Sequence, residues 1–238
     1  GREADELRPI RITLDYLKHA EGSCMIELGD TRLICAATLD NRVPPHAKEM
    51  NMGWLTAEYA MLPRSTGQRT VRDGVRGRIG GRSAEIQRLI GRSLRSVIHL
   101  DKLGERTFIL DCDVIQADGG TRTAAVTGGF VALAAAIRRL RAENQVGKGL
   151  IHDFVAATSV GIVEGRPVLD LCYLEDATAQ VDMNVVMTAD GRFVELQGTA
   201  EAHPFSESEL QEMLALARAG IAQLIEAQKQ ALGGEPIP

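Results

Sequence analysis

One short segment of this chain, residues 118–123, joins two runs of opposite character and so limits the folds that the chain can adopt. Residues 107–117 are apolar and strand-like, whereas residues 124–140 are rich in alanine and favour a helix. Between them, Gly119 and Gly120 allow a tight turn and bring bare backbone N–H groups close to a ligand. A helix that begins at such a turn offers unpaired N–H groups and a partial positive charge, so the segment predicts an anion site.

The polar side chains of this segment suit a phosphate group. Thr121 and Thr123 carry hydroxyl donors, and the planar guanidinium of Arg122 can grip a phosphate through two hydrogen bonds. The structural alternative is that the two glycines merely end a strand and that Arg122 is a solvated residue at a helix start. The order of strand, Gly-Gly, Thr, Arg and helix favours the phosphate site.

The length and composition are typical of a globular protein. The 238 residues, 45% hydrophobic and 25% charged, fit one large domain or two small ones. No run approaches the eighteen or so apolar residues that span a bilayer, and no signal-peptide pattern opens the chain, so we expect no membrane partner. Since the chain begins at Gly1, we expect a few native residues to precede it.

The cysteines lie singly inside apolar runs. No C-x-x-C pair occurs, and no Cys/His spacing typical of a zinc site is present. We therefore interpret them as buried free thiols and expect a cytoplasmic protein. They are Cys24, Cys35, Cys112 and Cys172.

Positive charge is concentrated in one stretch of the chain. The net charge of −5 argues against a nucleic-acid partner, yet residues 64–95 contain nine arginines, no lysine and two acidic residues. This stretch carries +7 and the remainder −12. Arginine without lysine favours phosphate binding or base stacking over mere solubility. The alternative is a set of interface ion pairs with the acidic remainder, and both hold if the arginines line a seam between subunits.

The order of the predicted elements favours an α+β fold. Alternating apolar and polar residues predict a hairpin, and the apolar pattern predicts two similar halves in which strands are followed by helices. Strands preceding helices in blocks argue against a doubly wound sheet. The predicted strands are 8–17, 23–28, 31–39, 52–61, 107–117, 153–163, 167–173, 180–188 and 192–198, and the predicted helices are 83–98, 124–140 and 207–232, the last with a capping box of Ser206 and Glu209.

An arginine-rich loop is predicted at residues 68–81. This stretch contains four glycines and four arginines and has no sustained hydrophobic period. We expect it to be exposed and mobile.

Two acidic residues are candidates for metal binding or proton transfer. If residues 176–182 were all strand, Asp176 and Asp182 would lie about 20 Å apart, too far to share a metal. A turn at residues 177–179 would bring them together, and two carboxylates near a phosphate suit Mg²⁺ or proton transfer to a leaving oxygen. From spacing alone, the simpler alternative is that Asp176 is a turn residue and Asp182 caps a strand.

Five blocks of the chain carry a family resemblance: Leu7-Arg8-Pro9, residues 53–59, residues 85–92, residues 111–122 and residues 181–185. Together and in this order, they closely resemble bacterial ribonuclease PH. That family consists of phosphate-dependent 3′→5′ exoribonucleases that trim the 3′ ends of tRNA precursors, and it shares its α+β fold with polynucleotide phosphorylase and exosome ring subunits. The resemblance implies a single domain over residues 1–238, a homo-hexamer built as a trimer of dimers, and inorganic phosphate as co-substrate.

The resemblance also implies roles for individual residues. The positions that hold the attacking phosphate are matched by Arg82, Gly120, Thr121 and Arg122. Asp176 and Asp182 match two essential acidic positions near the Mg²⁺. We expect Asp182 to help hold the metal and Asp176 to donate a proton to the leaving oxygen, although the two roles are exchangeable. The segment that guides the RNA backbone is matched by Arg69, Arg72, Arg76 and Arg78.

The resemblance therefore predicts an enzyme that trims tRNA precursors, and in principle rRNA, and releases nucleoside diphosphates. Such a reaction is reversible, so the enzyme is also a nucleotidyltransferase. The alternative is a catalytically silent ring subunit that binds RNA or partner subunits in an exosome-like assembly. The presence of every matched catalytic position argues against it.

Overall fold

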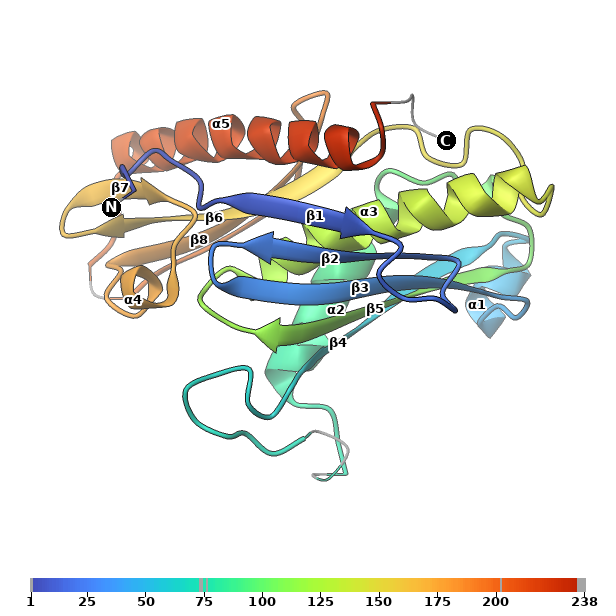
Figure 1. Cartoon of the computed structure of the whole chain (residues 1–238). Helices are drawn as coiled ribbons and strands as arrows, with labels where there is room; N and C mark the ends of the chain where they lie inside the picture. The colour runs from blue at the N-terminus through green and yellow to red at the C-terminus, as the bar shows by residue number, and fades with distance from the viewer. Residues whose placement is uncertain (1, 73–74, 76, 202, 235–238) are drawn as a thin grey trace.

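The computed structural model describes residues 2–72, 75, 77–201 and 203–234. Over these residues the chain forms two β-sheets and three helices longer than ten residues, which confirms the predicted α+β class (Figure 1).

The first sheet comes from the N-terminal half of the chain. Its strands, in spatial order, are β1 (Ile10–Leu14), β2 (Gly22–Leu28), β3 (Thr31–Asp40), β5 (Thr107–Gln116) and β4 (Trp54–Met61). The predicted β2–β3 hairpin forms. Adjacent strands of this sheet are antiparallel, except for β4 and β5, which are parallel. The chain crosses from β4 to β5 through α2 (Gly81–Arg95). Because parallel strands end at the same edge, the loop after β4 and the turn after β5 both leave the sheet there.

The second sheet is antiparallel and comes from the C-terminal half. Its order is β7 (Arg166–Leu169), β6 (Val155–Val163), β8 (Val181–Thr188) and β9 (Phe193–Ala200). The helix α5 (Glu207–Ala231) packs against β6, β7 and β8. Its predicted capping box is present, since the Ser206 hydroxyl accepts a hydrogen bond from the Glu209 backbone N–H at 3.3 Å.

The helix α3 (Thr121–Ala142) is the centre of the fold and packs against strands of both sheets. Gly128 permits its close approach to β2, because a Cβ there would lie only 2.7 Å from Ile26 Cγ2. Among the described residues, α3 alone is long and apolar enough to cross a membrane, but 83% of its apolar window is buried inside the protein. That burial is typical of a core helix.

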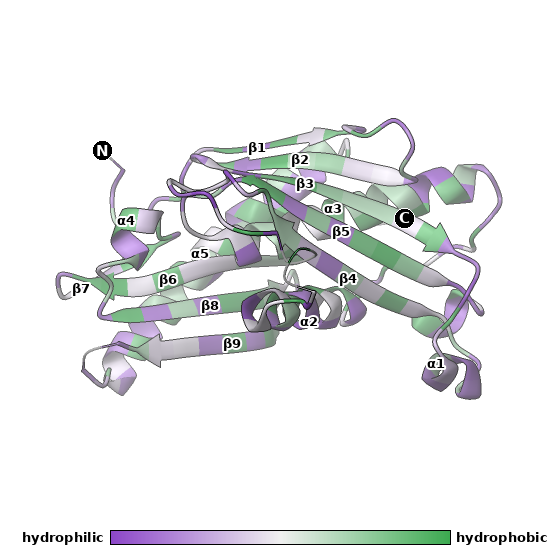
Figure 2. Cartoon of the chain, turned by 90° about the horizontal axis from the view of Figure 1, so that it is seen from below, coloured by the Kyte–Doolittle hydropathy of each residue, from purple (hydrophilic) through white to green (hydrophobic). Residues whose placement is uncertain are grey.

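One hydrophobic cluster joins the two halves. It extends from the first sheet through α2 and α3 to the second sheet and α5. Figure 2 shows the strands of the two sheets on either side of α2. Cys24, Cys35 and Cys112 are buried free thiols within this cluster, as predicted, whereas Cys172 is half-buried.

Two predicted strands are shorter than expected because a residue with positive φ ends each of them. The first strand stops at Leu14, before Asp15 with a φ of 52°. The predicted strand 167–173 stops at Leu169, before Asp170 with a φ of 56°. Residues Tyr173–Asp176 then form the short helix α4. The sequence also did not predict α1 (Pro45–Glu49) or the 3₁₀ turn η2 (Leu100–Lys102).

Candidate active site

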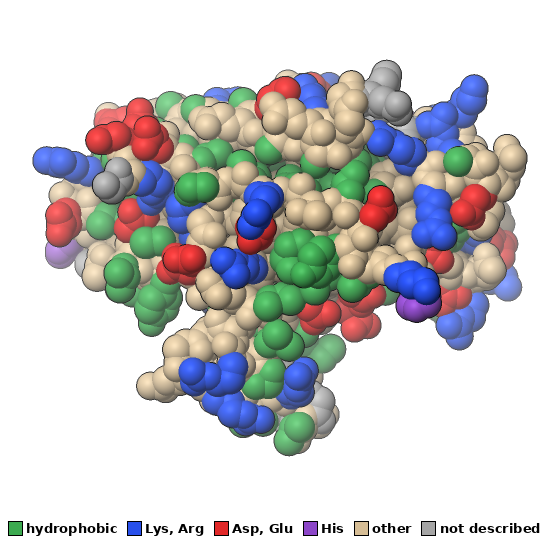
Figure 3. All heavy atoms as spheres, viewed as in Figure 1, with side chains coloured by type: hydrophobic (Ala, Val, Ile, Leu, Met, Phe, Trp, Pro, Cys, Tyr) green, Lys and Arg blue, Asp and Glu red, His purple; other side chains and the backbone are tan. Residues whose placement is uncertain are grey.

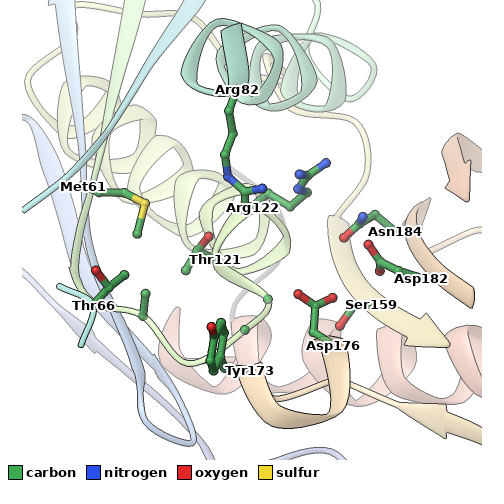
Figure 4. A pocket seen from close by; sticks show the side chains of 13 residues that line it. Met61, Thr66, Arg82, Thr121, Arg122, Ser159, Tyr173, Asp176, Asp182 and Asn184 are labelled. Carbon is green, nitrogen blue, oxygen red and sulfur yellow. The ribbon is translucent and has the colours of Figure 1, made fainter. Parts of the chain in front are cut away.

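A cavity of about 370 Å³ lies between residues of the two halves and brings most of the predicted site residues together. Figure 4 shows two guanidinium groups and two carboxylates directed toward the same space. The predicted residues in its wall are Arg82, Gly120, Thr121, Arg122, Asp176 and Asp182.

The Gly-Gly turn forms one wall of the cavity. Gly119 and Gly120 have φ angles of 74° and 65°, and Gly120 caps α3. Thr31 fixes the turn, because its hydroxyl donates to the Gly119 carbonyl at 2.6 Å and accepts from the Asp118 N–H at 2.9 Å. A Cβ on Gly119 would lie 2.4 Å from the Leu171 carbonyl oxygen, so only glycine fits there. Gly120 and the first residues of α3, Thr121 and Arg122, line the cavity, and the unpaired N–H groups of a helix start suit an anion.

The two arginines of the cavity differ in how they are held. The Arg122 guanidinium is mostly buried, donates to Gln197 Oε1 at 2.9 Å and lies 3.4 Å from Glu85 Oε2. Arg82, in the first turn of α2, is exposed and has no ion-pair partner in the part of the chain that the structure describes. The site thus combines one preorganised cation with one that is available to a ligand.

The two threonines of the turn have different roles. The Thr121 hydroxyl lies 2.8 Å from the hydroxyl of Tyr59. Burial raises the pKa of Tyr59, so this phenol stays neutral and can donate to Thr121, leaving the Thr121 proton for a ligand. Thr123 is buried and donates to the Gly120 carbonyl at 2.9 Å. The expectation that Thr123 faces an anion is therefore wrong, and it stabilises the turn instead.

A turn brings Asp176 and Asp182 to the same cavity, so the hypothesis of a shared site agrees with the geometry. Asp176 ends α4, and the chain turns before β8 places Asp182 in the cavity wall. Burial, together with the negative charges of Asp176 and Glu201, raises the pKa of Asp182 to about 6, although Arg122 and Arg82 oppose the shift. A carboxyl with that pKa is partly protonated near neutral pH.

The two carboxylates fit Mg²⁺. Magnesium is commonly held by one or two carboxylates together with water and the phosphate oxygens of a substrate. The cavity places Asp176 and Asp182 beside the Gly-Gly turn of residues 118–121, here named the phosphate turn. Within the described residues, no group of three or more His, Cys, Asp and Glu side chains could hold a metal ion. A cation here would therefore need oxygen ligands from a bound phosphate or from water.

A buried ion pair joins the turn to the end of β7, and sequence reasoning did not single it out. Arg8 donates to both Asp170 carboxylate oxygens, at 2.9 and 2.7 Å, and to the carbonyl oxygen of Asp118. Asp170 is fully buried and Arg8 is nearly so. Because this pair joins residues far apart in the chain, only the fold brings it together. The one sequence signal for Arg8 was the family resemblance of the Leu7-Arg8-Pro9 block.

The arginine loop projects from the body of the protein beyond β4, and Figure 3 shows its blue cationic side chains gathered on the projection. Arg69, Arg72 and Arg78 are exposed, whereas Arg76 lies outside the described residues. Beside the loop is a hollow of about 610 Å³, and Met61 and Arg82 line both this hollow and the cavity. Of the predicted RNA-guiding arginines, Arg72 lines this hollow.

Comparison with protein families gives matches over most of the chain. A model of the 3′ exoribonuclease family, domain 1, matches residues 6–138, and the model of domain 2 matches residues 153–220. Curated proteins named ribonuclease PH include one from Halalkalibacterium halodurans, 58% identical over 98% of this chain and 91% of the relative. A second, from Bacillus cereus, is 57% identical over 98% of this chain and 96% of the relative.

Solved structures share the fold at lower identity. Rice (Oryza sativa) Rrp46 gives a TM-score of 0.78 at 19% identity over 98% of both chains. The Archaeoglobus fulgidus exosome with RNA bound to the active site gives 0.78 at 19% identity over 95% of this chain and 90% of that one. The family models and the two curated relatives show family membership in addition to the fold. This chain belongs to the ribonuclease PH family of phosphorolytic 3′ exoribonucleases.

Proposed function

We propose that this chain removes nucleotides singly from the 3′ end of RNA, with inorganic phosphate as the nucleophile and nucleoside diphosphates as products. One observation carries the proposal: a single cavity contains a helix-capping Gly-Gly turn, two guanidinium groups and two carboxylates. Such a site can seat a free phosphate beside the phosphodiester that it attacks.

The proposed reaction exchanges one phosphorus–oxygen bond for another. Phosphate held by Arg82, Arg122, Thr121 and the Gly120 turn attacks the last internucleotide phosphorus. A bond forms from that phosphorus to an oxygen of the attacking phosphate, and its bond to the 3′ oxygen of the preceding nucleotide breaks. Because both reactants are anions, the main task of the two arginines is to neutralise their charge. The bonds exchanged are alike, so the enzyme also adds nucleotides from diphosphates.

The departing 3′ oxygen needs a proton, and we assign its donation to Asp182. The raised pKa of Asp182, about 6, supports this role because a donor must hold a proton near the working pH. Asp176, which is exposed at the cavity, is then the better metal ligand. The roles first expected of the two aspartates are thus exchanged in this proposal.

Asp176 is the residue that would hold Mg²⁺, together with water and the phosphate oxygens of the reactants. When bound, Mg²⁺ neutralises charge on the phosphate oxygens of the reactants. The arginines and the helix N-terminus would add positive charge near the same reactants.

The route of the RNA follows from the position of the arginine loop. We propose that Arg69, Arg72, Arg76 and Arg78 contact the phosphates of a single-stranded 3′ tail and lead it along the 610 Å³ hollow toward Arg82. The exposure of Arg69, Arg72 and Arg78 supports this part of the proposal.

The biological setting is part of the proposal as well. We infer that the substrates are tRNA precursors, and in addition rRNA, that the chain acts as a single domain, and that it assembles as a homo-hexamer, a trimer of dimers. Relatives named ribonuclease PH and a solved structure titled as an archaeal exosome core support the RNA substrate and the multimer. The free thiols Cys24, Cys35 and Cys112 support a reducing cytoplasm.

The test is incubation with a short single-stranded RNA, with and without phosphate, followed by separation of the released nucleotides. We expect diphosphates only when phosphate is present. Efficient release of monophosphates in phosphate-free buffer would contradict the proposal. Absence of any product, with RNA binding retained, would support the silent ring subunit, which the intact cavity and the 57–58% identity to ribonuclease PH proteins do not favour.

A further inference from the structure

Tyr173 is an exposed aromatic side chain in the wall of the proposed active site. Its relative exposure is 62%, which is the highest of any Phe, Tyr or Trp in the described residues. Figure 4 shows Tyr173 on the side of the cavity opposite Arg82. The ring leaves a large apolar face open to water in a cavity that also contains two guanidinium groups and two carboxylates.

The position of Tyr173 is fixed relative to the phosphate turn. Its backbone N–H donates to Asp118 Oδ1 at 3.2 Å, and Asp118 directly precedes Gly119. It begins α4, whose capping box includes a hydrogen bond from the Cys172 N–H to Glu175 Oε2 at 2.8 Å. Glu175 in turn forms an ion pair with Arg2. The backbone that carries the ring is therefore held at a set place beside the site.

The ring itself is free to receive a ligand. Across the residues that the structure describes, the Tyr173 hydroxyl has no hydrogen-bond partner. The neighbouring Leu174 is still more exposed, at 74%, but it is not part of the cavity wall. Tyr173 lines the cavity and Leu174 does not, so we assign the exposed Tyr173 ring to ligand contact and not to a general apolar surface of α4.

The chemistry of an aromatic face at this place suits a nucleobase. An enzyme that trims RNA must accept each base in turn at the 3′ end, and every base has a π-face whatever its hydrogen-bonding edge. An aromatic platform therefore binds the terminal base without selecting its identity. The guanidinium groups and the turn would hold the phosphates of the same nucleotide on the other side of the cavity.

We propose that Tyr173 is the stacking platform for the base of the 3′-terminal nucleotide, an inference that rests on the proposed RNA substrate. The platform sets the last nucleotide against Asp176 and Asp182, and it explains why a phosphate-binding cavity has an exposed aromatic ring in its wall. The ligand class is any purine or pyrimidine at an RNA 3′ end.

The test uses a short single-stranded RNA with 2-aminopurine as its 3′-terminal base, whose fluorescence falls when the base stacks. Binding is measured in phosphate-free buffer so that no trimming occurs. We expect the wild-type protein and Tyr173→Phe to quench the probe. Tyr173→Leu, which keeps apolar bulk but lacks a π-face, should abolish the quenching and weaken RNA binding by about 5- to 150-fold. The KM for phosphate should not change.

Two control variants separate stacking from other roles. Leu174→Ala removes the adjacent apolar side chain of α4, and Tyr16→Ala removes an aromatic side chain that is 49% exposed and lies outside the cavity wall. Both should quench like the wild type. If Tyr173→Leu also quenches like the wild type, or if it changes only the oligomer mass, the stacking proposal is wrong. Failure of the wild type to release diphosphates would instead contradict the proposed reaction, so the two failures are distinguishable.

Discussion

We expect phosphate binding to depend most on Arg122. Gln197 from β9 and Glu85 from α2 hold its guanidinium at the cavity. The Arg122 side chain therefore loses little conformational freedom when a ligand binds. A charge-assisted donor that is fixed before binding stabilises developing negative charge more than a flexible one.

Arg122→Ala should therefore reduce kcat/KM for phosphorolysis by on the order of 10²-fold or more, with the fold retained. Steady-state assays over a range of phosphate concentrations check this. Arg88→Ala is the matched control, because Arg88 is an exposed arginine of α2 outside the cavity wall. Near-normal activity in Arg122→Ala would place the phosphate elsewhere.

Asp182 should make the metal-free protein less stable as its carboxyl ionises. Its folded-state pKa of about 6 lies above the ordinary value of 3.8, so the fold favours the neutral carboxyl. The stability that Asp182 contributes is full below pH 4 and is lost as the pH rises through 6. Because the side chain is only half-buried and solvent weakens the effect, we expect a loss on the order of 2 kcal/mol.

Asp182→Asn, which imitates the neutral form, should therefore raise the melting temperature at pH 8 by roughly 5 °C in buffer with a chelator. At pH 4 the variant and the wild type should melt alike. Thermal unfolding at both pH values measures the difference. A variant that melts at or below the wild-type temperature at pH 8 would show that the ionised carboxyl is not disfavoured.

Five residues that the sequence predicted as site residues lie close to the turn or at matched positions, and their roles stay predictions. Arg82, Thr121, Arg122, Asp176 and Asp182 all reach one cavity. The residues that hold them in place were not predicted, because their partners are distant in sequence. Tyr59 contacts Thr121 from β4, and Gln197 contacts Arg122 from β9. No local sequence pattern predicts such pairs.

Among the elements, the segment before β1 links both halves at the active site. The Ala4 carbonyl accepts a hydrogen bond from the Leu169 N–H at 2.8 Å, and Arg8 binds both Asp170 and the Asp118 carbonyl. The segment therefore joins the end of β7 to the phosphate turn.

Arg8→Ala should lower the free energy of unfolding by about 3–5 kcal/mol, because it leaves the fully buried Asp170 carboxylate without its partner. Arg11→Ala is the control, since Arg11 pairs with Glu27 at the surface, where an ion pair adds little stability. Denaturant unfolding of both variants makes the comparison. Equal, small losses would mean that the buried pair does not secure the site.

The arginine loop is the second element with a testable role. Each phosphate contact releases counterions, so each loss of a contacting arginine should make the slope of log affinity against log salt shallower by roughly 0.7. Arg69→Ala, Arg72→Ala and Arg78→Ala test this by RNA titration at several salt concentrations. Arg42→Ala, an exposed arginine paired with Asp40, should leave the slope unchanged. A combined variant of the loop with wild-type affinity and slope would exclude the loop as the RNA guide.

The elements themselves were predictable where periodicity is strong. The β2–β3 hairpin and the capped helix α5 formed as expected, since both depend on local alternation and capping. The end of β7 and the short helix α4 were not predicted. Asp170 leaves the strand with positive φ because Arg8, from the other end of the chain, binds its carboxylate. A tertiary contact thus overrides the local pattern.

At the scale of the whole molecule, function depends on two halves that share one core. The phosphate turn and both arginines come from the first half, and the two carboxylates come from the second. The hydrophobic cluster that spans both sheets fixes these groups relative to one another. This arrangement supports our proposal that the chain acts as a single domain.

The central claim is that free phosphate, and not water, attacks the terminal phosphodiester. The most direct measurement follows ³²P-labelled inorganic phosphate during trimming of an unlabelled single-stranded RNA. The account predicts that the label enters the released nucleotides and resides only in the β-phosphate of nucleoside diphosphates, in an amount equal to the nucleotides removed. Unlabelled nucleoside monophosphates as the main product would contradict it.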